Sequence, residues 1–473
     1  MSPAPTDLSS QNTSVQVQVD PHTRKVPHSV RRLADLAYLE QSIHRMLCGW
    51  GNQFDAWEDK VALCAHVWDQ ACIVQSLRQR IDQFPGAHAD QPVSHKLEAL
   101  ANTVLNAPCF EDAVDGIYQV LNTALVNAYL DFIEKVSAIH DGPTHQIIRQ
   151  IVATKDRQRR WRVSYRQRVV HHVNQNYLED ITAQLASLDH LHAPIPMTDT
   201  QAAAPVGVHS SFRPMPAKVD PSWLTTGTHD ILDWIAVDFA DQIQARQLFW
   251  PIGYMRELGL AMDQLLWIYD SPDMPWAFAY DESRHLWDES RHGDSGYARM
   301  KELGITIQEV GFKHSRDLLG DRAQTDDGQR LAVMSPKALY EALFFIGMVA
   351  ETGHFKVKRE AYSDFKAGGD LASAEMMLYD IIDETMHVQY AHQWLGRLAE
   401  RAGLEHEGYE QRAHQIREDK QTQADQRVAA LRQDPNKHSD PSWQLYQQLR
   451  QRVHECCPLS NAQSCPSRSS KPM

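Results

Sequence analysis

Hydrophobic residues recur three and four positions apart through most of the chain, with polar residues between them. An early example is the series Leu33, Leu36, Leu39, Ile43 and Leu47. Side chains at this spacing lie on one face of an α-helix, so each such stretch predicts an amphipathic helix with a buried side. Good helix formers are abundant in these stretches, whereas glycine and proline are scarce. The pattern predicts an all-α protein.

The same pattern sets the expected helix boundaries. The first helix begins near Pro27, and further helices in this part of the chain are predicted at 58–83, 93–105, 110–138 and 144–187. Later, Thr228 is the expected N-cap of a helix that breaks or kinks at Pro251 and resumes over 252–269. Ser335 and Pro336 are a typical N-cap and first-turn pair. The remaining helices are predicted at 275–302, 336–366, 371–402, 405–432 and 441–455.

Composition divides the chain into segments. A length of 473 residues exceeds what one hydrophobic core usually supports, so more than one domain is expected. Prolines gather between His190 and Ser222 among small polar residues, as is typical of a linker. The predicted segments are a disordered tail (1–24), a helical bundle (25–190), the linker (191–222), a second bundle (223–404), C-terminal helices (405–455) and a disordered tail (456–473).

Charge and cysteine content narrow the class of protein. The net charge of −14 argues against binding to nucleic acid or to an anionic membrane surface. No apolar stretch is long enough to span a membrane, and no N-terminal apolar segment resembles a secretory signal, so a cytoplasmic protein is expected. The seven cysteines lack the spacing of a disulfide framework or a zinc site. The basic run from Lys155 to Arg168 could bind an acidic redox partner or RNA, but we favour a solvated helix face.

Four Glu-x-x-His sequences lie in one third of the chain. They are Glu282–His285, Glu289–His292, Glu351–His354 and Glu384–His387. With 22 glutamates and 24 histidines in the whole chain, the pattern would occur about once by chance. Residues three apart project from the same face of a helix, so each sequence offers a carboxylate oxygen and an imidazole nitrogen to one point. Helical bundles hold iron or manganese with such pairs.

A lone carboxylate precedes two of these sequences by similar intervals. Glu257 lies 32 residues before Glu289, and Glu351 lies 33 residues before Glu384. A repeated helix pair would give such intervals, and a four-helix bundle can hold two metals with one Glu from each of two helices and a Glu-x-x-His from each of the others. The predicted ligands are therefore Glu257, Glu289, His292, Glu351, Glu384 and His387.

The chemistry of this set indicates the metal. Two divalent cations would neutralise the four carboxylates, which could not all stay ionised together without them. Oxygen-rich ligation with two imidazoles suits iron or manganese, and the lack of thiolates disfavours a structural zinc. Asp288 and Asp383 each stand directly before a predicted glutamate ligand. Each aspartate could accept a hydrogen bond from the outer N–H of the histidine on the opposite helix and so fix its orientation.

These residues resemble the ferritin-like di-iron carboxylate superfamily and, within it, a group of bacterial ferritin-like proteins. The resemblance covers about residues 240–402. It rests on Asp288-Glu-Ser-Arg-His292 followed by Gly296, Arg299 and Leu303-Gly304, and on Gly369-Asp370 leading through Ile381-Ile382-Asp383-Glu384 to His387-Val388 and Trp394. It implies a ferritin-like four-helix bundle with two iron ions, or iron with manganese, that uses dioxygen.

Two histidines outside this set allow alternatives. Glu282 and His285 lie seven residues before Glu289 and His292, on nearly the same helix face. We prefer the later pair, because the earlier one lacks a carboxylate at the matching interval, and we treat it as a neighbour of the site. His354 is either a third imidazole ligand or a residue hydrogen-bonded beside the ligands. A third imidazole would favour oxygenase chemistry over storage.

The first bundle is predicted to be a degenerate ferritin-like repeat without metal. Glu40 precedes Gln70 by 30 residues, close to the interval in the second bundle, and Ile73 stands where the imidazole would be. Alignment of the third helices places Tyr129 at the position of a glutamate ligand. An ion pair between Glu40 and Arg159 could replace the metal. The alternative is that any two helical bundles can be aligned in this way.

The resulting hypothesis is a dinuclear non-heme iron oxygenase or oxidase. Its catalytic carboxylates would be Glu257, Glu289, Glu351 and Glu384. With dioxygen it would hydroxylate, N-oxygenate or desaturate a small organic substrate, using electrons from an external donor. The alternatives are a non-enzymatic iron-storage protein and a structural bundle whose Glu and His form surface pairs. The sequence is compatible with a homodimer and selects neither substrate nor donor.

Overall fold

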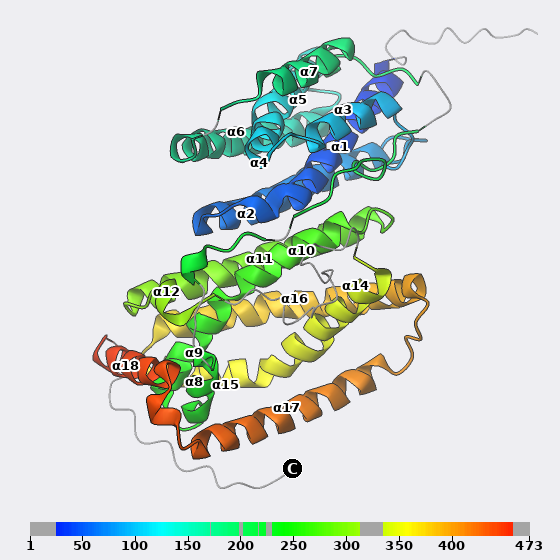
Figure 1. Cartoon of the computed structure of the whole chain (residues 1–473). Helices are drawn as coiled ribbons and strands as arrows, with labels where there is room; N and C mark the ends of the chain where they lie inside the picture. The colour runs from blue at the N-terminus through cyan, green and yellow to red at the C-terminus, as the bar shows by residue number, and fades with distance from the viewer. Residues whose placement is uncertain are drawn as a thin grey trace, which may run out of the picture.

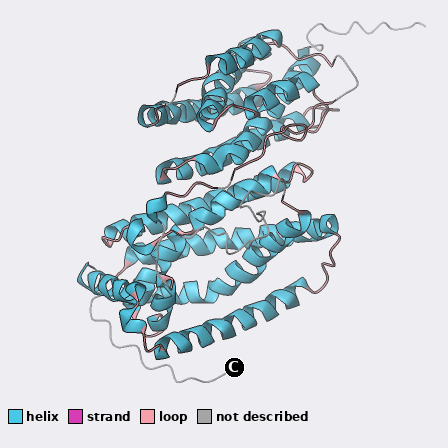
Figure 2. Ribbon diagram, viewed as in Figure 1, coloured by secondary structure: helices cyan, strands magenta, loops and turns pink. Residues whose placement is uncertain are grey.

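The computed structural model describes residues 25–456 except 171, 198–201, 216, 224–228 and 313–333. Within these residues the regular structure is helical, without strands (Figure 2). The predicted all-α class is confirmed. The predicted disordered tails, apart from Cys456, lie outside the described residues, and so does Thr228. No described helix combines the length and hydropathy needed to cross a membrane.

The first block contains seven helices among the residues described. They are α1 (Lys25–Trp50), α2 (Trp57–Asp82), α3 (His95–Leu105), α4 (Phe110–Asp115), α5 (Asn122–Lys135), α6 (Gly142–Arg168) and α7 (Gln175–Ser187). A π-helical stretch, Gly116–Leu121, joins α4 to α5. The single helix predicted over 144–187 is wrong. The chain leaves α6 after Arg168, and the Asn174 side chain starts α7 by accepting a hydrogen bond from Tyr177 N.

The second block and the C-terminal helices follow. They are α8 (Ile231–Asp238), α9 (Ile243–Met255), α10 (Glu257–Tyr269), α11 (Trp276–Glu302), α12 (Ile307–Val310), α14 (Pro336–Leu343), α15 (Thr352–Gly368), α16 (Leu371–Ala402), α17 (Tyr409–Gln433) and α18 (Pro441–Cys456). Pro251 lies inside α9, and the interruption falls at Arg256 instead. Ser335 caps α14 as predicted, and Gly369 and Gly403 end α15 and α16 in the left-handed conformation.

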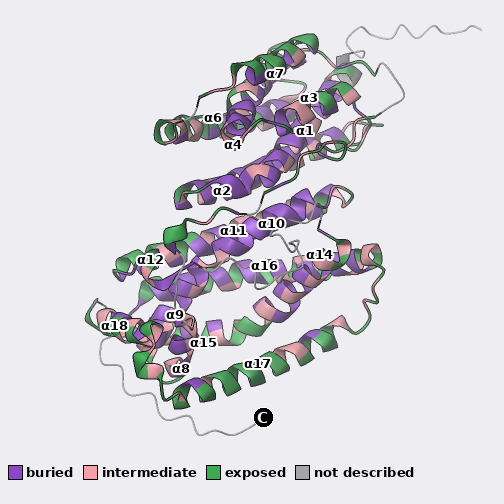
Figure 3. Ribbon diagram, viewed as in Figure 1, coloured by how far each residue is buried: buried purple, intermediate pink, exposed green. Residues whose placement is uncertain are grey.

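The two blocks pack through two pairs of helices, with α2 along α11 and α1 along α10 (Figure 1). Trp57 Nε1 donates a hydrogen bond to Asp294 Oδ1 at 3.0 Å, and His44 Nε2 lies 2.7 Å from Ser283 Oγ. One cluster of buried hydrophobic residues includes members of both blocks. Burial is concentrated in these facing helices, whereas α17 is mostly exposed (Figure 3). The two blocks thus share a hydrophobic core.

The proline-rich segment between the blocks is held against the first block where it is described. Ala203 N donates a hydrogen bond to Val93 O at 3.0 Å, and Lys218 N donates to Asn52 O at 2.8 Å. Val206 is buried in the shared core. This segment is therefore fixed at several points by backbone hydrogen bonds.

Candidate metal centre

Four elements of the second block direct carboxylates and imidazoles into one buried region. These side chains are Glu257 at the start of α10, His285, Glu289 and His292 on α11, Glu351 at the end of a π-helical stretch, and His387 on α16. The π-helical stretch, Phe344–Glu351, links α14 to α15, and such irregular turns recur at functional sites. Close packing here requires glycine, because a Cβ at Gly296 of α11 would lie 2.5 Å from Met255 N of α9.

One group consists of His285, Glu289, Glu351 and His387, all buried, with one potential ligand atom from each within 4.8 Å of the others. Glu351 Oε1 lies 3.1 Å from His285 Nε2 and 3.2 Å from His387 Nδ1. His285 Nε2 is also 3.3 Å from Glu289 Oε1. The His285 and His387 rings stack with centroids 3.8 Å apart. Two imidazoles and two carboxylates thus face one point.

A second group consists of Glu257, Glu289 and His292. His292 Nδ1 lies 3.3 Å from Glu257 Oε2 and 3.9 Å from Glu289 Oε2. Glu289 therefore directs Oε1 to the first group and Oε2 to the second. The Glu257 side chain is 27% exposed, compared with 4% for Glu289, so the second group is the more accessible to solvent.

Several buried polar atoms of this region have no hydrogen-bond partner. They include Glu257 Oε2, Glu351 Oε2, His285 Nδ1, His292 Nδ1, Asp380 Oδ1 and Glu384 Oε2. An unsatisfied buried polar group costs about 1–3 kcal/mol, so such atoms are normally paired. Their concentration around facing carboxylates and imidazoles fits a site for metal cations, which these donor types bind.

Two aspartates cross between α11 and α16 behind the imidazoles. His292 Nε2 lies 3.2 Å from Asp383 Oδ2, and His387 Nε2 lies 3.4 Å from Asp288 Oδ2. Each ring therefore turns Nε2 to an aspartate and Nδ1 to the centre. This is the crossed arrangement that the sequence predicts, and it orients both imidazoles.

Two arginines absent from the sequence-based site hold these aspartates. Arg284 Nε donates to Asp288 at 2.7 Å, and its NH2 lies 3.3 Å from Asp383 Oδ1. Arg291 NH2 lies 3.0 Å from Asp288 Oδ1 and also bonds Asp383. Both guanidinium groups lie over the Trp287 ring. The aspartates are thus neutralised on the side away from the centre. The hydrogen bond with His292, followed by the charge of Arg291, keeps the pKa of Asp383, at about 2, below its usual value despite burial.

The imidazoles are strongly basic in this arrangement. Burial alone would lower the pKa of His285, but Glu289 and Glu351 outweigh it and raise the pKa well above its ordinary value. Burial would raise the pKa of Glu351, yet His387 and His285 lower it. Carboxylates that draw protons onto these rings create the same attraction for a metal cation.

Glu384, His354 and His285 have other positions relative to the centre than the sequence suggests. Glu384, a predicted ligand, and His354, a possible third imidazole ligand, lie in neither group: Glu384 Oε1 pairs with Lys358 Nζ, and His354 is exposed on α15. The treatment of His285 as a mere neighbour is wrong, because it faces Glu289 and Glu351. The sequence does indicate this position of His285, because Asp281-Glu-Ser-Arg-His285 is repeated as Asp288-Glu-Ser-Arg-His292. The two copies are seven residues apart, which is nearly two helical turns, so they lie on the same helix face.

Glu282, the partner of His285 in that tandem sequence, is fully buried. Neither carboxylate oxygen has a hydrogen-bond partner, and Oε2 lies 3.8 Å from His285 Nδ1. Burial raises the pKa of this carboxyl to about 7. Glu282 is therefore an uncompensated acid beside the first group.

The first block has a buried polar cluster formed by Glu40, Gln70, Tyr129 and Lys155. Lys155 Nζ lies 2.8 Å from Glu40 Oε2, Tyr129 donates to Glu40 Oε1 at 3.0 Å, and Gln70 Nε2 also bonds Glu40. Lys155 additionally donates to Asn122 Oδ1 at 2.7 Å. Glu40, Gln70 and Tyr129, which the repeat alignment sets at ligand positions, therefore lie together in the first block.

The cation of this cluster differs from the prediction. Lys155 lies where an ion pair with Arg159 was expected, whereas Arg159 points outward and pairs with Asp156 at 2.7 Å. The remainder of the basic run also forms internal ion pairs, including Arg162 with Asp115. On α6, one basic side chain thus points into the bundle while others pair on its surface.

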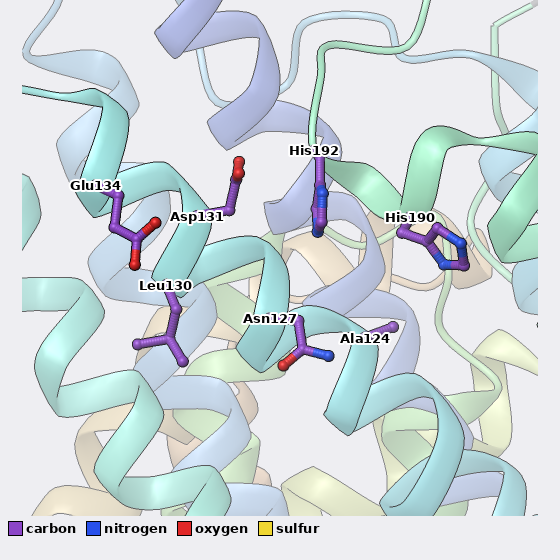
Figure 4. Close-up of a pocket in the computed structure, with 7 residues that line it drawn as sticks. All are labelled: Ala124, Asn127, Leu130, Asp131, Glu134, His190 and His192. Carbon is purple, nitrogen blue, oxygen red and sulfur yellow. The ribbon is translucent and has the colours of Figure 1, made fainter.

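A separate cavity of about 390 Å³ lies on the first block (Figure 4). It is lined by Ala124, Asn127, Leu130, Asp131, Glu134, His190 and His192. Asp131 is already paired with Arg32 and Lys135, at 2.8 Å each. Among the residues described, both groups able to hold a metal lie in the second block.

No family model, curated protein or solved structure matches this chain.

Proposed function

We propose that the second block is a ferritin-like dinuclear metal protein that binds two iron ions, or iron with manganese. The main support is Glu289, which offers one carboxylate oxygen to each of the two ligand groups. A carboxylate placed between two groups suits a pair of cations held side by side. Glu257 and His292 would complete one position, and His285, Glu351 and His387 the other. The crossed aspartates and the pairing of α10 with α11 also support the ferritin-like assignment.

We further propose that the protein is a dioxygen-dependent oxidoreductase acting on a small organic substrate, with an external electron donor. Bound iron would supply the electrons and the open coordination that dioxygen chemistry needs. The presence of a third imidazole, His285 in place of His354, favours an oxygenase or oxidase over storage. The chain's own contribution is to orient the rings through Asp288 and Asp383 and to exclude water from the first group.

The accessible edge of the centre favours one direction of approach. Glu257 is partly exposed, while Glu289, Glu351 and His387 are nearly or fully enclosed. A small molecule would therefore reach the second group before the first. The exposed His354, on the helix that follows Glu351, is available to contact such a molecule.

Metal analysis tests the proposed centre. Anaerobic loading with Fe(II), followed by desalting and elemental analysis, should give about two metal ions per chain. Glu289→Ala should lose both, because its carboxylate belongs to both groups. Glu302→Ala is the matched control, because Glu302 is exposed on the same helix and pairs only with Arg299. Wild-type protein that retains well under one ion per chain would overturn the proposal.

Dioxygen consumption tests the proposed reaction class. Fe(II)-loaded protein with a chemical reductant and a panel of small amines and hydrocarbons should consume dioxygen in repeated turnovers, and Glu289→Ala should not. Storage instead predicts uptake that stops when the added iron is oxidised, together with a large assembly in size-exclusion chromatography. Uptake limited to the added iron would remove the enzymatic part of the proposal and leave the metal centre intact.

A further inference from the structure

Lys358 places a permanent cation beside the second ligand group. Its ammonium is buried, lies 2.6 Å from Asp380 Oδ2 and also bonds Glu384 Oε1. The Trp250 and Tyr254 rings lie against it, with centroids 6.0 and 5.3 Å from Nζ. No part of the proposed metal centre uses this lysine as a ligand, so its burial there requires another explanation.

The ammonium binds only one carboxylate oxygen of each acidic partner. Asp380 Oδ2 is bound by Lys358 and by the Tyr254 hydroxyl, whereas Oδ1 is 3.5 Å from His292 Nδ1 and has no hydrogen bond. Glu384 likewise bonds Lys358 through Oε1 and leaves Oε2 without a hydrogen-bond partner. Both carboxylates therefore remain next to the second group while their charge is engaged by the lysine.

The two metal positions consequently differ in their ligands and in the electrostatic field that the Lys358 ammonium creates. The first has two imidazoles and two carboxylates. The second has one imidazole, Glu257 and a share of Glu289, and it lies next to the ammonium. A buried positive charge repels a second cation strongly, because the protein interior screens charge less than water does.

We propose that Lys358 is a built-in cation that makes the two positions unequal, so that the first fills tightly and the second fills weakly and reversibly. The lysine competes with the second metal ion for Asp380 and Glu384. It is a positioning residue for these carboxylates and it limits occupancy of the more accessible position. This inference rests on the proposed function, since it concerns the same centre.

The first block of the same chain provides an independent example of this device. There Lys155 directs its ammonium to the point where Glu40, Gln70 and Asn122 converge, and no group able to hold a metal is found among the described residues of that block. One lysine thus neutralises the single carboxylate of this cluster and occupies the place of a cation. In the second block one lysine faces several carboxylates and would close only part of the site.

Titration with Mn(II) tests the proposal, because the EPR signal of free Mn(II) counts the bound ions without any reaction. The wild-type full-length chain should bind one Mn(II) tightly and a second with at least about tenfold weaker affinity. Lys358→Met should strengthen the second step about tenfold or more and leave the first nearly unchanged. Lys358→Arg, which keeps the charge, should keep the difference. Wild-type protein with two equal affinities would overturn the inference, whatever the variants do.

Thermal unfolding separates this role from a merely structural one. Without metal, Lys358→Met leaves the buried carboxylates of Asp380 and Glu384 without their cation and should unfold at a lower temperature than wild type. Saturating Mn(II) should then raise its Tm by more than it raises that of wild type. A smaller rise, or loss of the second step in Lys358→Met, contradicts the proposal. If Lys358→Met does not fold, Lys358→Gln serves for both measurements. Absence of any Mn(II) binding to wild type would instead reject the metal centre itself.

Discussion

The two blocks contain related buried polar clusters that differ in how their charge is balanced. In the first block, one carboxylate, Glu40, meets one ammonium, Lys155, with Gln70 and Tyr129 as neutral partners. In the second block, Glu257, Glu289 and Glu351 meet three imidazoles, and Lys358 is occupied by two further acids. Both carboxylate oxygens of Glu40 have partners in the first cluster, where Gln70 Oε1 lacks one, whereas several carboxylate and imidazole atoms of the second cluster lack a partner.

The pKa values of the two buried lysines shift in opposite directions. Burial lowers the pKa of Lys155, and Glu40 offsets this only in part. Burial would also lower the pKa of Lys358, but Asp380, Glu384 and Glu257 outweigh it and raise the pKa above its ordinary value. Carboxylates outnumber the lysine beside them in the second block, and both groups that could hold a metal among the described residues lie there.

The largest expected effect comes from breaking the first cluster. Lys155→Met leaves Glu40 buried and unpaired, so it should lower the free energy of unfolding by about 3–5 kcal/mol. The double variant Glu40→Gln with Lys155→Met should recover much of this loss. Urea unfolding measures both, with Arg159→Met on the surface of α6 as the control. A loss no greater than that of Arg159→Met would contradict the assignment of Lys155 as the internal cation.

A buried acid in the second block, Glu282, should make the stability of the protein depend on pH. Glu282 has a pKa of about 7 in the folded, metal-free protein, compared with an ordinary value of 4.5 when unfolded. The folded state therefore binds the proton more tightly, and stability falls as pH rises from about 4.5 to 7. Glu282→Gln should remove up to about 3 kcal/mol of this fall. Equal pH profiles for wild type and variant, measured by urea unfolding in EDTA, would rule the effect out.

Metal binding should stabilise the protein only through the two ligand groups of the second block. A ligand at one hundred times its Kd adds about 2.7 kcal/mol per site to the free energy of unfolding. Mn(II) should therefore raise Tm reversibly, with EDTA restoring the original value. Glu351→Ala should lose most of the rise, and Tyr129→Phe, at the position that the proposed repeat alignment pairs with Glu351, should keep it. An equal rise in both variants would show that the metal binds elsewhere.

The smallest expected effect concerns the crossed aspartates. Asp383→Asn weakens the orientation of His292 and should reduce metal affinity about 10- to 100-fold, equivalent to about 1.4–2.7 kcal/mol. Competition with a fluorescent chelator measures this change. Asp273→Asn is the control, since Asp273 pairs with Arg401 and is 56% exposed. Unchanged affinity in Asp383→Asn would mean that the His292 ring is held by its packing alone.

The helical class, most helix boundaries and five of the six predicted ligands that lie in the two groups of the second block could be predicted from the sequence. Helical spacing needs only the chain in order, so Glu289–His292 and the lone Glu257 could be paired without coordinates. The crossed geometry of Asp288 and Asp383 also followed from symmetry between two helices. In the first block the same spacing aligned Glu40, Gln70 and Tyr129 with ligand positions, but it named Arg159 as the partner of Glu40.

The identity of the cations and imidazoles that face each cluster depends on how the helices pack. Lys155 rather than Arg159 enters the first cluster, and Lys358 engages Glu384, because these choices depend on which turn of a helix faces its neighbour. His285 joins the centre because the π-helical stretch ending at Glu351 places that carboxylate beside it. Spacing along one helix fixes a face but not its rotation or depth in the bundle, and those are set by packing among distant helices.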